Sequence, residues 1–369
     1  MLHFLTLFSL AVALVQGLVV PELNARDGPA PLALDFTVEK SIGNITISDW
    51  RAQRAPKTSK RAYSEKISNV DYAYFLNVYL GSSKQKSYVL LDTGSSDLWV
   101  PTKDYNHKKS STVKDTGHAF NIEYVDGSTA NGEYYTDTLS FGSAQPVLSQ
   151  FEFAAASTDS FGVFGIADRD QESTRYTYDN FPWALQKAGL TPKASYSLYL
   201  GQDHGSGVVI FGGIDTEKYE GSLSKYSIDT SESSLSLDVE TVSVGGQQVQ
   251  ENAPYVLDSG TSLALVSEGL LNTLNDVFSV DSNGLVSCNQ PSDEYITFSF
   301  GQSSVKVPYT DAVYSNGDGT CSLAFSYDQG YTILGDIFLR NAYVYYDLTD
   351  QTISLAQVKY SLASNIVAA

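Results

Sequence analysis

The chain has 369 residues, with 23 Lys and Arg against 42 Asp and Glu, so its formal net charge at pH 7 is −19. Such an acidic protein is repelled by phosphate backbones, which argues against nucleic acid as a partner. With 42% hydrophobic and 18% charged residues, the chain has enough apolar content for a large core, and its length predicts two domains or lobes.

The N-terminus carries a targeting signal. Residues Phe4–Val15 are mostly apolar but too few to span a bilayer, and small residues follow near Gly17. We therefore expect a signal peptide at residues 1–17, a secreted and extracellular protein, and no membrane partner. The C-terminal residues 361–369 lack the long hydrophobic tail of a lipid-anchor signal.

Residues 18–61 form a leader that differs from the rest of the chain. The leader has a net charge of +2 and ends in the dibasic pair Lys60-Arg61. In a secreted protein this pair predicts a processing site, and the mature chain would carry −21; an ordinary solvated pair is the alternative. We expect the leader to be a propeptide that lies across an acidic cleft and inhibits it. Acid would protonate the carboxylates and break the ion pairs.

Much of the remaining chain consists of short alternating segments, such as Asn77–Gly81, separated by Gly, Ser, Asn and Asp. Such a pattern is typical of β-strands joined by turns. The chain also holds 25 Tyr and 17 Phe, which favour strand positions. We therefore expect an all-β protein.

Two short segments of this β-rich chain are nearly alike. Leu90–Ser96 and, much later in the chain, Val256–Ser262 each run from a hydrophobic strand into an Asp, a hydroxyl residue, a Gly and two more hydroxyl residues. Burying a carboxylate is costly, so two such placements suggest that Asp92 and Asp258 meet. Two carboxyl groups about 3 Å apart cannot both ionise, and they share one proton as an acid/base pair. One copy alone is better explained as a turn or a helix cap; the second copy disfavours that explanation.

The duplication extends further along the chain. Val163–Gly165 follows Asp92 and Ile333–Gly335 follows Asp258 at nearly the same spacing, and each has two large apolar residues before a Gly. The shared order predicts two similar β-lobes related by a pseudo-dyad, with the Asp loops on the floor of a cleft. Plain core packing is the alternative for each apolar pair, and it is compatible with a strand that supports the Asp loop.

The two cysteines, Cys288 and Cys321, predict one disulfide in an oxidising compartment, with two free thiols as the alternative. A metal site built on them would need further ligands nearby, and the four His lie at positions 3, 107, 118 and 204. We expect no metal and no cofactor.

Over residues 69–357 the chain resembles the pepsin-like aspartic proteases. Besides the two Asp motifs, the resemblance rests on Ser96–Pro101, Val209–Asp215 and Ile333–Arg340. The dibasic junction, the single disulfide and the length are most similar to the secreted aspartic proteases of yeasts, the candidapepsin type. The resemblance implies a bilobal pepsin-like fold with a deep cleft between lobes at 62–226 and 227–369. It also implies a monomeric fungal zymogen that cleaves polypeptides at acid pH and binds pepstatin-type inhibitors.

The resemblance also assigns roles in the two Asp loops. Asp92 and Asp258 would hold a water between them, one taking its proton and the other donating a proton to the forming gem-diol. The neighbouring residues would support this dyad. Thr93 and Ser259 would cross-link the loops, Ser95 and Thr261 would hydrogen-bond the outer carboxylate oxygens, and Gly94 and Gly260 would border the substrate.

A hairpin flap at Phe120–Ser128 completes the expected site. By resemblance, Tyr124 is the flap tyrosine, hydrogen-bonded to Trp99, and Gly127 lies near the tip. Val125 stands where the family usually has Gly, which makes the flap's hydrogen bonds to substrate an open question. Asp126 is a candidate specificity residue that would accept Lys at P1 beside large hydrophobic side chains; a solvated turn residue is the alternative. A second departure lies outside the flap, where Phe161 replaces an Asp found in many relatives.

Two other functions fit the sequence less well. A catalytically weak or inactive homologue that acts as a binding protein would usually lose a dyad Asp or its Gly, and both motifs are intact here. A cell-wall or vacuolar processing protease of narrow specificity would use the same chemistry in a different role.

Overall fold

The structure is a computed structural model. It describes residues 28–40, 72–125, 127–142, 147–158, 161–201, 206–228 and 234–369. The predicted signal peptide, the dibasic pair Lys60-Arg61 and the flap residue Asp126 lie outside the described residues, as does most of the leader.

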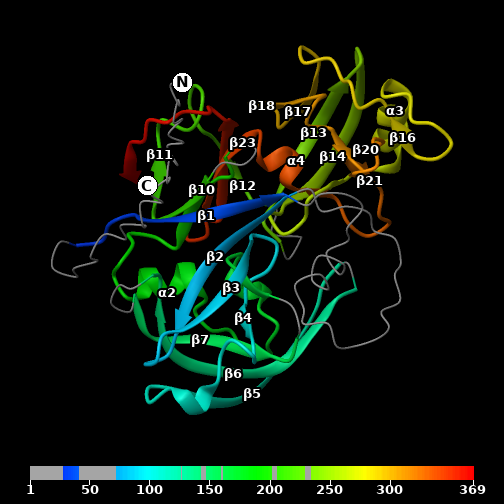
Figure 1. Ribbon diagram of the computed structural model, residues 1–369. Helices are drawn as coiled ribbons and strands as arrows, with labels where there is room; N and C mark the ends of the chain where they lie inside the picture. The colour runs from blue at the N-terminus through cyan, green and yellow to red at the C-terminus, as the bar shows by residue number, and fades with distance from the viewer. Residues whose placement is uncertain are drawn as a thin grey trace, which may run out of the picture.

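One large, mainly antiparallel sheet forms the body of the molecule (Figure 1). Its strands alternate buried apolar residues with more exposed ones at the edges and are buried on both faces near the centre. In spatial order they are β12 (Ser224–Ser227), β24 (Thr352–Gln357), β23 (Ala342–Asp347), β9 (Ser195–Tyr199), β10 (Ser206–Phe211), β1 (Leu32–Lys40), β2 (Tyr72–Leu80), β3 (Gln85–Asp92), β8 (Gly162–Gly165), β4 (Leu98–Pro101), β7 (Leu148–Ala156), β6 (Thr129–Ser140) and β5 (Lys114–Glu123).

The C-terminal half adds a second sheet and two small ones. The second sheet has the order β18 (Ser304–Pro308), β17 (Tyr295–Ser299), β13 (Ser236–Val244), β14 (Gln247–Leu257), β22 (Ile333–Leu334), β15 (Ala264–Leu265) and β21 (Phe325–Ser326). The small sheets are β16 (Leu285–Val286), β20 (Cys321–Leu323) and β19 (Val313–Ser315), and β11 (Gly213–Asp215) with β25 (Ile366–Ala368). The all-β prediction is confirmed.

Among the residues that the structure describes, helices are few and short. They are η1 (His107–Lys109), η2 (Arg169–Gln171), α2 (Phe181–Lys187), α3 (Glu268–Val277) and α4 (Asp336–Leu339). Figure 1 shows α2 against the large sheet and α3 at the far end of the second sheet. Within the described ranges, no helix has the length and apolar content needed to cross a membrane.

The predicted duplication appears in the strand registers. In the first half β3 runs parallel to β8, with Asp92 opposite Gly165, and β4 pairs antiparallel with the same β8. In the second half β14 runs parallel to β22, with Leu257 opposite Leu334, and β15 pairs antiparallel with β22. The same three-strand arrangement therefore supports both Asp loops.

The leader contributes a strand to the centre of the molecule. β1 lies between β10 and β2, and its side chains Leu32, Leu34 and Phe36 are buried. Figure 1 shows β1 crossing the middle of the molecule, between the strands β5–β7 and the strands β13 and β14. The sequence placed this segment in a removable leader and gave no sign that the leader enters the sheet.

Cys288 and Cys321 form the predicted disulfide, with Cα atoms 5.2 Å apart and a sequence separation of 33. Cys288 lies two residues after β16 and Cys321 is the first residue of β20. The two strands β16 and β20 pair with each other in one small sheet. The bond therefore closes a loop at the edge of the second half rather than joining the two halves.

Replacing both cysteines with Ser should lower the free energy of unfolding by roughly 3–4 kcal/mol, because the bond restricts a loop of about 34 residues in the unfolded chain. Guanidinium unfolding of the purified protein measures this loss as a lower midpoint. An unchanged midpoint with an unchanged slope would contradict it.

Candidate active site

Two matching loops bring Asp92 and Asp258 together. Asp92 is the last residue of β3 and Asp258 directly follows β14. Their exposed fractions are 5% and 8%, so both carboxyl groups are largely removed from water. The two are close enough for a hydrogen bond between their side chains. The apolar strands behind them cannot bend away without exposing the core, so the chain holds the carboxyl groups in place.

Each carboxyl group receives the same pair of hydrogen bonds. The backbone N–H of Gly94 donates to Asp92 Oδ1 at 2.8 Å, and that of Gly260 donates to Asp258 Oδ1 at 2.7 Å. The hydroxyl of Ser95 donates to Asp92 Oδ2. At the other loop, Thr261 donates to Asp258 Oδ2 at 2.6 Å. Donors of this kind stabilise the ionised form of a carboxyl group and fix its orientation.

Thr93 and Ser259 link one loop to the other. The N–H of Thr93 donates to Ser259 Oγ at 3.2 Å, and the N–H of Ser259 donates to Thr93 Oγ1 at 2.9 Å. Each hydroxyl then donates across to the opposite strand, Thr93 to the carbonyl of Leu257 at 2.8 Å and Ser259 to the carbonyl of Leu91 at 3.1 Å. All four bonds are buried, so neither loop can move without breaking bonds to the other.

Glycine is required where each loop meets the opposite carboxyl group. A Cβ on Gly94 would lie 2.6 Å from the Cγ of Asp258, and a Cβ on Gly260 would lie 2.5 Å from Oδ1 of Asp92. Both distances are far below van der Waals contact. The Gly in each motif is therefore explained by close approach rather than by an unusual backbone angle.

The electrostatics of the pair favour a shared proton. Burial, and next the charge of Asp258, raise the pKa of Asp92 well above its usual value, although the bonds from Ser95 and Gly94 act in the opposite direction. A third carboxyl group, Asp336, lies behind the dyad at the start of α4. Burial and the charge of Asp258 also raise the pKa of Asp336 well above its usual value. Its backbone N–H donates to the carbonyl of Thr261 at 2.9 Å, which ties α4 to the second loop.

The sequence did not single out Asp336 as a site residue. Asp336 stood inside the apolar segment Ile333–Arg340, where one Asp could equally have been a helix cap. Its neighbours Thr261 and Asp258 are distant in sequence, and only the fold brings them together.

The flap is the turn between β5 and β6. The N–H of Tyr124 donates to the carbonyl of Ser128 at 2.9 Å, and the N–H of Gly127 donates to the carbonyl of Tyr124 at 2.8 Å. Gly127 has φ +74°, which L side chains rarely adopt. Trp99 Nε1 donates to the hydroxyl of Tyr124 at 2.7 Å, and Val125 at the tip is 50% exposed.

An aromatic cluster joins the flap to the first Asp loop. Tyr124 and Phe161 pack against buried residues that include Trp99, Phe120 and Leu90, and Leu90 is two residues before Asp92. Phe161 also meets Phe75 edge to face, with ring centroids 4.9 Å apart. Phe161 therefore adds to an apolar wall beside the flap.

Three further carboxyl groups lie behind this wall. Asp97 Oδ1 accepts hydrogen bonds from the hydroxyls of Tyr134 at 2.7 Å and Tyr178 at 2.8 Å. Glu172 accepts from the N–H of Tyr178, and burial, helped by the negative charges of Asp97 and Glu152, raises the pKa of Glu172 to about 9. Burial likewise raises the pKa of Glu152.

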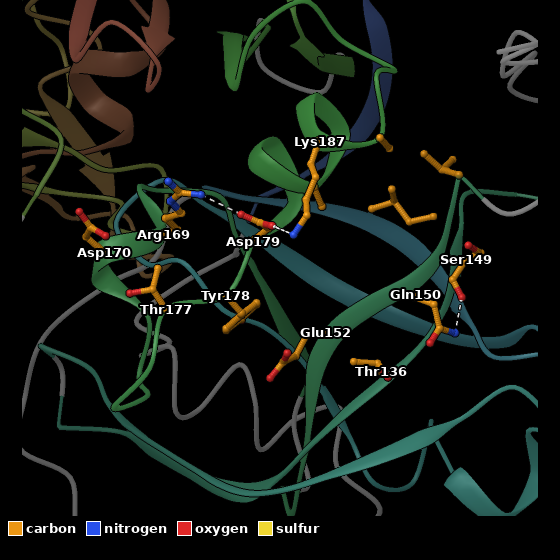
Figure 2. A pocket seen from close by; sticks show the side chains of 14 residues that line it. Thr136, Ser149, Gln150, Glu152, Arg169, Asp170, Thr177, Tyr178, Asp179 and Lys187 are labelled. Atoms are coloured by element: carbon orange, nitrogen blue, oxygen red, sulfur yellow. Dashed lines mark hydrogen bonds and ion pairs between the residues drawn. The ribbon is translucent and has the colours of Figure 1, made fainter. Parts of the chain in front are cut away.

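Glu152 and Tyr178 border a cavity of about 910 Å³. Figure 2 shows them on one side of it, with Asp179 on another side, held by Arg169 at 2.8 Å and Lys187 at 2.5 Å. Glu152 therefore lies at a second opening on the first lobe.

Comparison with known proteins gives a family for this architecture. The profile of the family described as eukaryotic aspartyl protease matches residues 73–358. Secreted aspartic protease 3 of Candida albicans is 35% identical over 396 aligned positions, covering 98% of this chain and 98% of the relative. Secreted aspartic protease 8 of the same species is 36% identical, covering 98% of this chain and 96% of the relative.

A solved structure supports the fold. The aspartic proteinase from Irpex lacteus superposes with a TM-score of 0.68 at 22% identity, covering 80% of this chain and 97% of that chain. The predicted bilobal, pepsin-like fold is confirmed.

The Gly94→Ala variant should lose activity at least 100-fold while remaining folded, because its Cβ would push the Asp258 carboxyl group out of place. The measurement is kcat on a peptide substrate in acid, with circular dichroism to check the fold. Gly269→Ala is the matched control, since the nearest atom to its Cβ would be 3.9 Å away. Equal activity of the two variants would contradict the close-approach argument.

The Glu172→Gln variant should unfold at a higher temperature than the wild type at pH 8, by roughly 3 °C, and at the same temperature at pH 4. A raised pKa in the folded state gives stability that is full below the unfolded value of 4.5 and is lost as the pH rises toward about 9. Gln carries no charge and avoids that loss. Glu294→Gln, at an exposed position, is the control, and an equal shift in both variants would contradict the assignment.

Proposed function

Because the chain belongs to the eukaryotic aspartyl protease family, we propose that it is a secreted endopeptidase that works in acid and hydrolyses peptide bonds with a water molecule held between Asp92 and Asp258. The observation that carries this proposal is the pair of cross-linked loops, which presents two buried carboxyl groups in contact with matching hydrogen bonds. The family acts on polypeptides, so these are the substrates.

The proposed mechanism uses the two carboxyl groups in complementary states. The ionised one takes a proton from the water as the water attacks the scissile carbonyl, and the protonated one donates to the carbonyl oxygen. Both roles require that the pair hold a single proton. The raised pKa of Asp92 beside Asp258 supports that state, and no covalent intermediate is involved.

The hydrogen bonds around the dyad would hold both carboxyl groups in the orientation that proton transfer requires. Ser95 and Gly94 hold Asp92, and Thr261 and Gly260 hold Asp258, so neither carboxyl group needs to reorient during the reaction. Preorganised donors of this kind lower the barrier because no reorganisation is needed at the moment of reaction.

The flap would close over the bound peptide. Tyr124, fixed by Trp99, would line the cleft next to the apolar wall, which favours large hydrophobic residues at P1. Val125 is exposed at the tip, so its side chain is available to contact substrate. Acceptance of Lys at P1 through Asp126 stays a prediction.

The proposal also covers the N-terminal leader and the route of secretion. We propose a signal peptide at 1–17, a propeptide at 18–61 cleaved after Lys60-Arg61, and mature lobes at 62–226 and 227–369. The secreted relatives support the route out of the cell. The buried strand β1 supports a leader that is built into the folded precursor. Inhibition by a leader lying across the cleft stays a prediction. We further propose a monomer that binds pepstatin-type inhibitors.

The direct test is digestion of an acid-denatured protein at about pH 3.5, where a shared-proton pair is half ionised. The Asp258→Asn variant should be at least 1,000-fold slower than wild type, since it removes one member of the pair. Pepstatin should stop the wild-type reaction. Asp238→Asn, at an exposed strand position, is the matched control and should retain full activity.

Two outcomes would contradict the proposal. Full activity of Asp258→Asn would remove the dyad from the mechanism. A processed, folded wild type without any activity would favour a binding homologue, in which case the exposed Val125 is the first position to change back to Gly.

A further inference from the structure

Lysine is concentrated in one short part of an otherwise acidic protein. Residues 84–114 contain six of the 16 Lys and Arg residues of the predicted mature chain, and three Asp. Two of those Asp, Asp92 and Asp97, are buried. The six lysines are Lys84, Lys86, Lys103, Lys108, Lys109 and Lys114, and we call them the lysine patch.

The fold brings the separate parts of this segment together. The turn between β2 and β3 packs against the residues around η1, where the N–H of Ser82 donates to Ser110 Oγ at 3.0 Å and the N–H of Ser111 donates to Ser82 Oγ at 2.8 Å. Gln85 and Asn106 exchange two further hydrogen bonds, at 3.1 and 2.9 Å. Lys84 and Lys86 flank Gln85, so both lie next to the lysines of η1.

A glycine allows this close packing. Gly81 has φ +76°, and a Cβ there would lie 2.8 Å from Ser110 Oγ. The turn is therefore held tightly against the η1 segment, and the lysines project from a rigid surface rather than from a loose loop.

The lysine patch is exposed, and four of its lysines are unpaired within the described part of the chain. All six lysines are exposed. Lys86, Lys108, Lys109 and Lys114 make no ion pair with any residue that the structure describes. The neighbouring carboxylates accept hydrogen bonds from other groups: Asp104 accepts from Ser87 Oγ, Asp115 accepts from the N–H of Gly117, and buried Asp137 accepts from Tyr105 and Thr112.

The lysine patch is far from the cleft. Lys114 begins β5, whereas the flap turn follows Glu123 at the other end of the same ten-residue strand. The two ends pair with Thr136 and Thr129 of β6, seven residues apart, which at about 3.3 Å per residue is roughly 23 Å. β5 is also the edge strand of the large sheet, five places away from β3, whose last residue is Asp92 (Figure 1). A ligand on the lysine patch would leave the active site open.

The surroundings of the lysine patch limit the kind of partner. Between residues 81 and 118 no large hydrophobic side chain is exposed, so the surface offers neither an anchor for a bilayer nor an aromatic platform for nucleic-acid bases. His107 is stacked on Tyr135 and is not presented to a ligand. Lysines also act as separate point charges, which suits a flexible polymer better than a planar group.

An acidic working pH limits which anionic groups of a partner remain charged. Carboxylates lose their charge near pH 4, whereas sulfate and phosphate esters keep a negative charge there and the lysines keep theirs. We propose that the lysine patch binds a polysaccharide that carries sulfate or phosphate ester groups, and that it holds the protein on such a polymer while the cleft remains free. The choice of ester groups rests on the proposed acid working range.

The test is binding of the purified protein to immobilised heparin, a sulfated polysaccharide, at pH 4. The wild type should be retained, and added NaCl should release it, because binding between charges releases counterions. The variant Lys86→Gln, Lys108→Gln, Lys109→Gln, Lys114→Gln should bind at least tenfold more weakly. The control variant Lys187→Gln, Lys225→Gln, Lys306→Gln, Lys359→Gln loses the same charge elsewhere and should stay within twofold of wild type.

Three results would overturn the proposal: no retention of the wild type, equal weakening in both variants, or equally tight binding of wild type to RNA or to anionic lipid vesicles. Both variants should cleave a short peptide as fast as the wild type, since none of these lysines contacts the dyad loops or the flap. Binding and cleavage are measured separately, so failure of the lysine patch and failure of the proposed function are distinguishable.

Discussion

The mutual contact of two buried carboxyl groups is the constraint on which the rest of the structure depends. Charge repulsion and loss of hydration oppose that contact. The four buried hydrogen bonds between Thr93, Ser259 and the opposite strands hold the loops together against it. Gly94 and Gly260 remove the atoms that would otherwise keep the loops apart. One proton shared between the two carboxyl groups would remove the repulsion, and it is the state that the proposed mechanism requires.

The two halves of the fold serve this contact. Each Asp loop leaves a buried strand that is paired in parallel with a second apolar strand, β8 or β22. These strands are paired within larger sheets, so the Asp loops are held in fixed positions by the core. The flap and its aromatic wall depend in turn on Asp97, which fixes Tyr134 and Tyr178 by hydrogen bonds. Buried acids thus recur in both places.

The sequence predicted the features that local patterns encode. Asp92 and Asp258 stood out because the same motif occurs twice, and Cys288 and Cys321 because no other cysteine competes. The central position of β1 could not be predicted, since it depends on pairing with β10, a strand far along the chain. The burial of Glu172 and Asp336 could not be predicted from the sequence either, because their neighbours come from distant segments of the chain. The lysine patch could be recognised only from sequence and structure together. The sequence shows the concentration of lysines, and the packing of Gly81 against Ser110 shows that they lie on one surface.

The most direct test of this account is a carbon NMR titration of the free protein with labelled aspartate carboxyl groups, assigned with the Asp92→Asn and Asp258→Asn variants. We expect the pair to titrate in two well-separated steps and to hold one proton across the acid range between them. Loss of both protons in a single step near pH 4, as for two independent carboxyl groups, would contradict it.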